Sequence, residues 1–572
     1  MRKGVYCCLV AMLLLAGCRK DPVTSSDRLT LSAEGRGGNA KMAVEGALAY
    51  WVTGDEVFIN GETLTVSVDR ANSSATVTSG SGFAAPYCGV YPASICSSLN
   101  VANASCTLVL PSSYTYATVT YGTISLQSLQ TPMVAYAASG TNLMFRHVTA
   151  AINVEIVNHY GFTIEVDSLV VESNKYQLCG IRQIALDNII SVSPVEVADA
   201  ELRRVKMTCT GTLQLLAGET AIVQIPVLPV DSDNKFTVKV GVHKVDQPAV
   251  TKLFSKTQTT GGDLLRNQLG YAPAKFGGLF SVSSTHKVII SQGNLQYKAS
   301  TGKWMFAKAQ YESIGDAPGN SNFSGNRSTQ SDSIDLFGWA TSGWDGASAY
   351  SPYHCQPYDY VGNSPSNSHG YGYGPNTRID NSSSYSYAYN LTGTYARCDW
   401  GVYNPIANGG NVAARWRTLT GGDEGEWRYL CATRSASTVG STANARVAKV
   451  KVAGVNGYIV FPDEYTHPVG VATPAHINPD AYQAWSGVTS FSADDWFKME
   501  AEGAVFLPCT GYRSYDNNNQ PSFTGNNGYY WSTTYASTGN AYYVQLGPGT
   551  PFYYDSNPRR LGCSVRLVHD VE

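Results

Sequence analysis

The first half of the chain alternates apolar and polar residues over short runs. These runs are rich in Val, Ile, Thr and aromatic residues, and they end at turn-forming residues such as Asn60-Gly61. The pattern predicts strands at residues 56–60, 63–68, 75–78, 106–110, 151–157, 163–171, 221–227 and 236–242. Because no convincing amphipathic helix interrupts them, we expect one or two β-sandwich domains, and two in tandem would divide near residues 150–165.

The second half has a different character. Nine of the ten Trp residues and 26 of the 37 Tyr residues lie after residue 275, which marks a domain boundary, and the Gly- and Pro-containing residues 271–280 are interpreted as a linker. Short helices are predicted through residues 426–430, opened by Thr420 with Asp423, and over residues 492–502, opened by Ser492. Long Gly-, Asn-, Ser- and Tyr-rich loops, 345–405 and 513–529, link short strands. Residues 281–572 are therefore predicted to form an α+β domain.

The N-terminus is typical of an exported protein. Residues 1–17 combine the basic Arg2 and Lys3 with an apolar stretch that is too short to span a bilayer, which predicts a signal peptide. Leu15-Ala16-Gly17-Cys18 resembles a bacterial lipobox, which implies cleavage before Cys18 and acylation of its thiol, for example with palmitate. We therefore expect a lipidated tether at 18–28 and a surface-exposed lipoprotein of the outer membrane. An ordinary signal peptide with an incidental cysteine is the alternative.

Charge and cysteine usage narrow the function further. The chain has 40 Lys and Arg against 43 Asp and Glu and no basic run, so nucleic acid is not an expected partner. Ten cysteines follow Cys18 without a CxxC or HExxH motif, so neither a metal nor another cofactor is expected. Disulfides and buried free thiols both stay open, and Cys88, Cys96 and Cys106 are the closest cluster.

Five short motifs in the first half occur in a fixed order. They are Trp51-Val52-Thr53-Gly54-Asp55, Tyr91-Pro92-Ala93, Leu110-Pro111, Pro132-Met133-Val134-Ala135 and Leu143-Met144-Phe145. In this order they resemble the fimbrillin family, whereas a generic sandwich with a core of aromatic residues is the alternative. The resemblance implies a surface fimbrial subunit over residues 29–270, with Trp51 and Phe145 in its core.

The fimbrillin resemblance also implies partners. Subunits of that family bind other fimbrial subunits by strand complementation, in which an extended segment of one chain completes the sheet of another. Stalk subunits lose their first strand by cleavage after a basic residue. In this chain Arg28, Arg36 and Lys41 flank the candidate strand Leu29–Ala33, and the sequence does not choose among them.

Motifs in the second half resemble a different family. Trp416-Arg417-Thr418-Leu419, Glu426-Trp427-Arg428, Tyr530-Trp531-Ser532 and Gly562-Cys563-Ser564 are similar to the major-paralogous-domain (FISUMP) family. This resemblance implies a C-type-lectin-like or formylglycine-generating-enzyme-like fold over residues 281–572. The tryptophans in these and neighbouring motifs are expected in the core: Trp304, Trp339, Trp416, Trp427 and Trp531.

The sequence gives little support to two other interpretations, a formylglycine-generating-type enzyme and a calcium-binding lectin. Formylglycine-generating enzymes use a cysteine pair, but Cys509 and Cys563 lie in strand-like runs without a catalytic motif, so we assign no catalytic residue. Residues 516–522 offer oxygen ligands for calcium, yet they depart from the lectin loop signature, with Ser522 where an acidic or amide residue is expected.

Aromatic recognition is the favoured chemistry of the second half. Tyrosine rings can stack on sugar faces or peptide side chains, while Asp and Asn bind hydroxyl groups. On loops 350–403 and 513–529 we expect stacking by Tyr371, Tyr373, Tyr387 and Tyr515, and polar contacts by Asp516 and Asn518. The resulting hypothesis is a fimbrial tip or accessory adhesin that binds a glycan or protein ligand. A standalone glycan-binding surface lipoprotein is the alternative.

Overall fold

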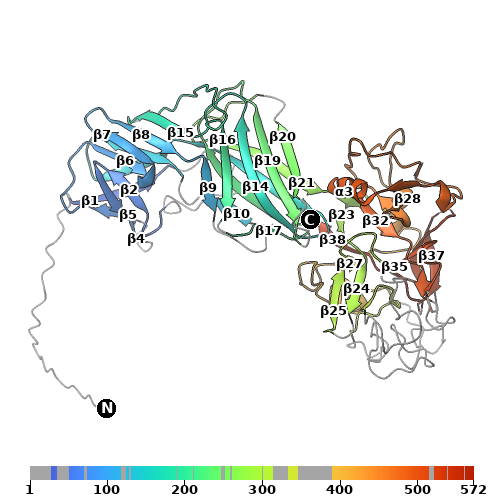
Figure 1. The fold of residues 1–572 in the computed structure, drawn as a ribbon. Helices are drawn as coiled ribbons and strands as arrows, with labels where there is room; N and C mark the ends of the chain where they lie inside the picture. Colours follow the sequence, from blue (N-terminus) through green and yellow to red (C-terminus); the bar gives the residue numbers. More distant parts are fainter. Residues whose placement is uncertain are drawn as a thin grey trace, which may run out of the picture.

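The structure is a computed structural model. It describes residues 27–34, 51–69, 74–116, 124–127, 131–187, 190–209, 211–245, 251–257, 261–298, 301–313, 333–344, 389–513, 521–537, 539–549, 551–559 and 561–571. These residues form three regions in a row, which we call the first sandwich, the second sandwich and the C-terminal domain (Figure 1). Strands dominate the described chain, so the predicted mainly β fold is confirmed.

The first sandwich contains a large sheet and a small one. The large sheet has the order β3-β2-β6-β11-β12-β1-β5-β4, and the small sheet has the order β15-β8-β7. Their strands are β1 (Arg28–Ala33), β2 (Glu56–Ile59), β3 (Glu62–Thr65), β4 (Ser67–Asp69), β5 (Ser74–Thr78), β6 (Tyr87–Tyr91), β7 (Cys96–Asn100), β8 (Ser105–Leu110), β11 (Met133–Ala137), β12 (Asn142–His147) and β15 (Gly180–Ala185).

Both faces of the large sheet are buried where it meets the small one. Along β11, Met133 and Ala135 belong to the core cluster around Trp51, whereas Val134 belongs to the cluster that includes Leu108 of β8. This follows from the alternation of side chains along a strand. Trp51 and Phe145 are fully buried, so their predicted core positions are confirmed.

The second sandwich packs a four-stranded sheet against a six-stranded one. Their orders are β10-β18-β13-β21 and β20-β19-β14-β16-β9, with β17 paired to β14. The strands are β9 (Ser113–Tyr116), β10 (Ile124–Gln127), β13 (Ala150–His159), β14 (Ile164–Ser173), β16 (Arg204–Cys209), β17 (Gln214–Leu215), β18 (Thr220–Val227), β19 (Phe236–Lys244), β20 (Thr251–Thr257) and β21 (Leu269–Gly277). One core cluster of Val, Ile, Leu and aromatic side chains fills the space between the sheets.

The linker expected at residues 271–280 is wrong over most of its length. β21 occupies residues 269–277 and pairs in parallel with β13, from Ala151 opposite Leu269 to His159 opposite Gly277. Pro273 is tolerated because β21 is an edge strand, where a missing N–H leaves no ladder bond unmade on the open side. Pro273 and Gly277, which suggest a linker in the sequence, are therefore part of a strand.

The two sandwiches are interleaved along the chain. β9 and β10 belong to the second sandwich although they precede β11, and β15 belongs to the first although it follows β14. For this reason no single cut near residues 150–165 separates them.

The C-terminal domain is built from small sheets with short helices. Its sheets have the orders β22-β23-β38-β27, β25-β24-β26, β30-β28-β29-β32 with β31 beside β28, β33-β34 and β35-β36-β37. The strands are β22 (Phe280–Ser281), β23 (Lys287–Ile290), β24 (Leu295–Lys298), β25 (Lys303–Phe306), β26 (Ser333–Ile334), β27 (Arg417–Thr418), β28 (Val447–Val452), β29 (Val455–Val460), β30 (His476–Ile477), β31 (Thr489–Phe491), β32 (Val505–Pro508), β33 (Tyr512–Arg513), β34 (Pro521–Ser522), β35 (Gly528–Ser537), β36 (Asn540–Leu546), β37 (Phe552–Pro558) and β38 (Leu567–Val571). The five tryptophans expected in the core are all buried.

The α-helices are α1 (Trp400–Tyr403), α2 (Glu426–Arg428) and α3 (Ala493–Ala501). Ser492 caps α3 in a capping box with Asp495, as its sequence predicts. The capping box expected between Thr420 and Asp423 is not formed: the N-cap residue of α2 is Gly425, which has no side-chain cap, and Thr420 instead exchanges two hydrogen bonds with Glu426. The N–H of Glu426 donates to Thr420 Oγ1 at 3.0 Å, and the N–H of Thr420 donates to Glu426 Oε2 at 2.9 Å.

Candidate functional site

The residues predicted to bind ligand lie outside the described part of the chain. They are Tyr371, Tyr373, Tyr387, Tyr515, Asp516 and Asn518; the lipidation site Cys18 and the cleavage candidates Arg36 and Lys41 also lie outside it. The structure therefore describes only the borders of the two loops.

Exposed aromatic rings stand at those borders. Tyr389 is half exposed and stacks on Tyr395 with ring centroids 4.5 Å apart. Phe523, which the sequence analysis missed, is 53% exposed and stacks on Tyr512 at 5.8 Å. Its φ of 59° is uncommon for a bulky residue. A lone Phe in a polar loop was the one sequence signal for this position.

The first strand of the fold occupies an unusual place. β1 lies inside the large sheet, parallel to β12 on one side and antiparallel to β5 on the other. Its sequence alternates, so that Leu29, Leu31 and Ala33 point into the core while Thr30 is exposed. We call the space between β12 and β5 that holds this strand the β1 slot.

The slot is lined by the apolar core of the first sandwich. Phe145 of β12 contacts Trp51 edge to face, with ring centroids 5.2 Å apart. A Cβ at Gly89 would lie 2.8 Å from the Phe145 ring, so this glycine makes room for the ring. Burying a leucine side chain contributes about 1.5–3 kcal/mol, so Leu29 and Leu31 anchor the strand.

Polar groups fix both ends of β1. Arg28 Nη2 donates to Thr76 Oγ1 at 3.1 Å. At the other end, Glu34 forms an ion pair with Arg266, which precedes β21 in the second sandwich; the closest atoms, Arg266 Nη1 and Glu34 Oε2, are 2.6 Å apart. β1 is therefore held by apolar burial, two hydrogen-bonded strand edges and a charged contact.

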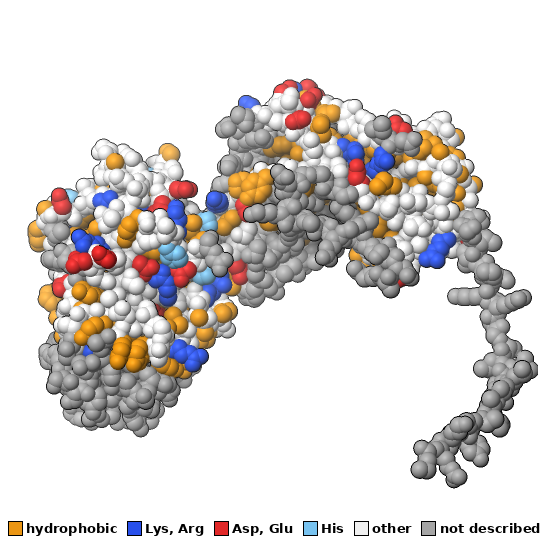
Figure 2. All heavy atoms as spheres, turned by 180° about the vertical axis from the view of Figure 1, so that it is seen from behind, with side chains coloured by type: hydrophobic (Ala, Val, Ile, Leu, Met, Phe, Trp, Pro, Cys, Tyr) orange, Lys and Arg blue, Asp and Glu red, His pale blue; other side chains and the backbone are white. Residues whose placement is uncertain are grey.

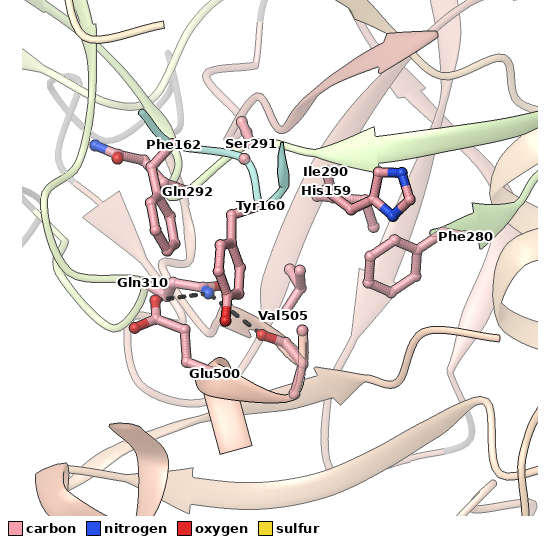
Figure 3. A pocket seen from close by; sticks show the side chains of 13 residues that line it. His159, Tyr160, Phe162, Phe280, Ile290, Ser291, Gln292, Gln310, Glu500 and Val505 are labelled. Carbon is pink, nitrogen blue, oxygen red and sulfur yellow. Dashed lines mark hydrogen bonds between the residues drawn. The ribbon is translucent and has the colours of Figure 1, made fainter. Parts of the chain in front are cut away.

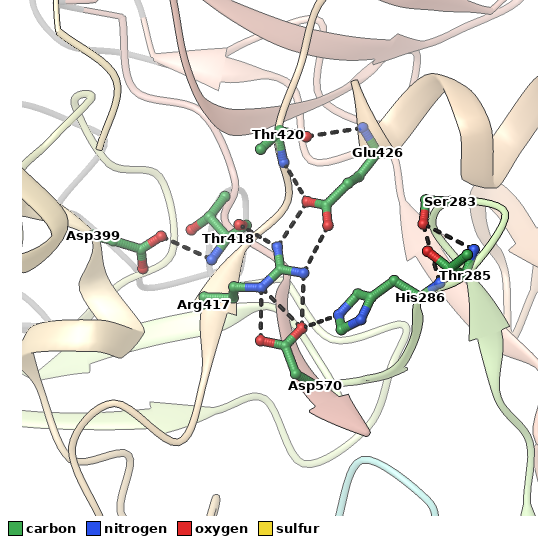
Figure 4. Close-up of polar contacts among 9 residues, drawn as sticks. All are labelled: Ser283, Thr285, His286, Asp399, Arg417, Thr418, Thr420, Glu426 and Asp570. Atoms are coloured by element: carbon green, nitrogen blue, oxygen red, sulfur yellow. Dashed lines mark hydrogen bonds and ion pairs between the residues drawn. The ribbon is translucent and has the colours of Figure 1, made fainter. Parts of the chain in front are cut away.

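A second polar cluster surrounds Arg417 (Figure 4). Its guanidinium donates to both carboxylate oxygens of Glu426 at 2.7 Å and to Asp570 at 2.8–3.0 Å. His286 Nε2 lies 2.7 Å from Asp570 Oδ1. Burial by itself raises the pKa of Asp570, but the hydrogen bonds from Arg417 and His286 lower it more. Through these contacts the cluster joins β27, β38 and α2.

The thiols named for the enzymatic alternative are inaccessible. Cys509 and Cys563 are buried, and burial raises the pKa of both. A raised thiol pKa disfavours the thiolate, which is the nucleophilic form. Their environment is that of core cysteines.

All eight cysteines with described side chains are free: Cys88, Cys96, Cys106, Cys179, Cys398, Cys431, Cys509 and Cys563. Within the described ranges, no cluster of three His, Cys, Asp or Glu side chains could hold a metal ion. None of the described helices is long and apolar enough to cross a membrane.

A small cavity lies where the second sandwich meets the C-terminal domain (Figure 3). Two polar side chains in its lining are hydrogen-bonded: Tyr160 Oη donates to the Ala501 carbonyl at 2.6 Å, and Gln310 Nε2 donates to Glu500 Oε1 at 3.0 Å. A Cβ at Gly161 would lie 2.0 Å from the Ile290 carbonyl oxygen. Such close backbone approach and internal pairing are typical of a packed joint between domains rather than of a ligand pocket.

The face of the molecule drawn in Figure 2 carries charges of both signs. On the face drawn in Figure 2, the coloured Lys and Arg side chains are interspersed with Asp and Glu. This agrees with the nearly balanced composition and gives no extended basic stripe among the residues coloured there.

A family model described as a domain of unknown function (DUF8237) matches residues 486–568, within the C-terminal domain. No curated protein matches the chain.

Solved structures from Bacteroides are similar to part of the chain at low identity and low TM-score. One is described as a putative cell adhesion protein from Bacteroides ovatus; it is 12% identical with a TM-score of 0.25, and the match covers 44% of this chain and 92% of that one. Another is described as a putative cell adhesion protein from Bacteroides fragilis; it is 12% identical with a TM-score of 0.26, and the match covers 43% of this chain and 93% of that one. A third is described as a fimbrial protein from Bacteroides vulgatus; it is 11% identical with a TM-score of 0.20, and the match covers 44% of this chain and 95% of that one. At these TM-scores the likeness carries no argument about function.

Proposed function

We propose that this protein is a cell-surface adhesin of the fimbrial tip or accessory type. In this proposal the first sandwich docks to a fimbrial subunit by strand complementation, and the C-terminal domain binds a glycan or protein ligand. Acylated Cys18 attaches the chain to the outer membrane. The observation that carries the docking step is the position of β1 between β12 and β5.

The physical basis is the cost of an empty slot. Without β1, the facing edges of β12 and β5 would lose their hydrogen-bond partners and the core would lose the side chains of Leu29, Leu31 and Ala33. An unpaired apolar slot of this kind binds an extended segment, because main-chain hydrogen bonds supply affinity and side-chain positions supply register.

The position of β1 also separates the cleavage candidates by their consequences. Arg28 is the first residue of β1, so a cut after it would leave the strand joined to the sandwich. Arg36 and Lys41 follow β1, so a cut after either would leave the strand held without a covalent bond. Within this proposal, Arg36 and Lys41 are therefore the productive sites.

The placement at a tip or as an accessory subunit is supported by β38. This strand is paired on both sides, by β23 and β27, and Leu567 and Val568 are buried. β38 is therefore not available as a donor strand. The chain is suited to accept a strand into the β1 slot rather than to donate this one.

The test of docking uses the full chain with a specific protease site inserted between Gly37 and Gly38. The cut protein is incubated with a labelled peptide of residues 27–36, and incorporation is measured by native size-exclusion chromatography. We expect the peptide to enter the cut protein but not the uncut protein. A peptide with Leu29→Asp and Leu31→Asp is the control, and failure of the unmodified peptide to enter the cut protein would refute the docking proposal.

The test of ligand binding targets the predicted loop. The full chain carrying Tyr371→Ala and Tyr373→Ala is compared with the unmodified chain on a glycan array and against host surface proteins. Each stacked ring contributes about 1 kcal/mol, so the double variant should lose at least tenfold in affinity. Tyr482→Ala, at an exposed tyrosine outside the predicted loops, is the control. Unchanged binding by the double variant would place the site elsewhere.

A further inference from the structure

An ion pair ties the end of β1 to the second sandwich. Glu34 follows β1 directly, whereas Arg266 lies 232 residues later in the sequence, just before β21. Arg266 Nη1 donates to Glu34 Oε2 at 2.6 Å, and Arg266 Nη2 donates to Glu34 Oε1 at 3.2 Å. The two side chains are only 22% and 24% exposed, so both charges are largely shielded from water.

Neighbouring backbone groups hold this pair in one geometry. Arg266 Nη1 also donates to the His147 carbonyl at 3.0 Å, and the N–H of His147 donates to Glu34 Oε2 at 3.3 Å. The N–H of Glu34 donates to the Phe145 carbonyl at 2.8 Å. Glu34 therefore continues the pairing of β1 with β12 by one residue, and the fork of Arg266 is aimed at the place where its carboxylate lies.

We infer that Arg266 is a specificity-determining residue for the strand that fills the β1 slot. It selects an extended segment with apolar side chains at three alternate positions and an Asp or Glu immediately after the third. This inference rests on the proposed docking by strand complementation. The partner is thus defined by chemistry: an acidic residue that ends an inward-facing apolar repeat.

The selection follows from the properties of the two groups. A planar guanidinium binds a carboxylate through two parallel hydrogen bonds, which a neutral side chain cannot reproduce. A strand lacking the acid would leave Arg266 shielded from water without its counter-charge, which is costly.

The ion pair between Glu34 and Arg266 also favours one register of the strand in the β1 slot. A slip of one residue would move the acid by about 3.3 Å and would turn the polar positions of the strand toward the core. Apolar burial and the ion pair therefore favour the same alignment, in which Leu31 lies opposite Leu143 and Ala33 opposite Phe145.

The test is a competition experiment on the cut full chain described above. Unlabelled peptides of residues 27–36, with Glu34 or with Glu34→Gln, displace the labelled strand from unmodified protein and from an Arg266→Gln variant. We expect the Glu34→Gln peptide to need about tenfold more for half-displacement from unmodified protein, and to match the Glu34 peptide on Arg266→Gln.

Controls keep the two proposals separate. Arg428→Gln removes an exposed positive charge from the C-terminal domain and should leave the tenfold ratio intact. If Arg266→Gln does not fold, Arg266→Lys replaces it, and its ratio should fall to about two- to threefold because an ammonium lacks the fork. Equal displacement by both peptides from unmodified protein would overturn the role of Arg266 while docking stands. If neither peptide enters the slot, both proposals fail.

Discussion

Shortening Leu31 to alanine should loosen the strand at the centre of the first sandwich. Leu31 is 4% exposed and lies between Leu143 of β12 and Ala75 of β5. Leu→Ala substitutions in protein cores cost about 2–5 kcal/mol, the spread reflecting how far the surroundings collapse into the cavity. β1 is a single short strand near one end of the described chain, so partial collapse is feasible and we expect about 3 kcal/mol.

This cost should be visible as local opening. With 1.4 kcal/mol per tenfold change in an equilibrium constant, about 3 kcal/mol raises the open population roughly a hundredfold. Backbone amides that exchange when β1 leaves should speed up to the same degree, including that of Glu34, which donates to the Phe145 carbonyl at 2.8 Å. Hydrogen–deuterium exchange with mass spectrometry measures peptides from β1, β5 and β12, and β13 and β14 serve as an internal reference.

Ser32→Ala is the matched control. Ser32 is the next residue of the same strand, and its Oγ makes one long, exposed hydrogen bond to Asn142 Oδ1 at 3.4 Å. Its removal should change stability by less than about 0.5 kcal/mol. If Leu31→Ala exchanges no faster than Ser32→Ala in β5 and β12, then the inward-facing side chains do not hold β1, and the argument for the slot is refuted.

Three further outcomes follow from the C-terminal domain and its junction. The pKa of Asp570 is lowered because hydrogen bonds from Arg417 and His286 outweigh the opposing effect of burial. The contribution of Asp570 to stability is therefore present above the unfolded pKa of about 4 and is lost as the pH falls through the lower folded value. In thermal unfolding measured against pH, Asp570→Asn should therefore weaken the fall in stability at acid pH. Ser492→Ala removes the side-chain cap of α3 and should cost about 1 kcal/mol in urea unfolding followed by tryptophan fluorescence; no change would mean that the cap is dispensable. Gly161→Ala places a Cβ 2.0 Å from a backbone oxygen and should loosen the joint, seen as faster proteolysis between the second sandwich and the C-terminal domain, and an unchanged digestion pattern would contradict that packing.

Local sequence patterns predict many of the strands and one helix start. The alternation over residues 151–157 and 163–171 predicts β13 and β14, and Ser492 predicts the start of α3. These features depend on neighbours within a few residues, which the sequence displays directly. The buried positions of Trp51 and Phe145 agree with what the resemblance of the five motifs implies.

Long-range pairing could not be predicted in the same way. Nothing local to residues 269–277 shows that β13 lies beside them, and the Gly and Pro residues there suggested a linker. Leu29–Ala33 was predicted as a strand, but its parallel alignment with β12 depends on residues more than a hundred positions away. The contact between Glu34 and Arg266 requires both sandwiches to be folded, so no sequence spacing indicates it.

The parallel pairing of β13 and β21 has a mechanical consequence. β21 is the covalent route from the second sandwich into the C-terminal domain, and it pairs with β13 over nine residues that run in the same direction. Tension that pulls the C-terminal domain away from the sandwich would load this ladder in shear, so its hydrogen bonds must yield together rather than one after another. β13 ends at a turn in which the Tyr160 hydroxyl donates a hydrogen bond to the Ala501 carbonyl. Part of the load is therefore carried by the contact between the second sandwich and the C-terminal domain as well. The rate of forced unfolding, rather than the equilibrium stability, would then set how long β21 stays paired with β13 when flow pulls on the C-terminal domain.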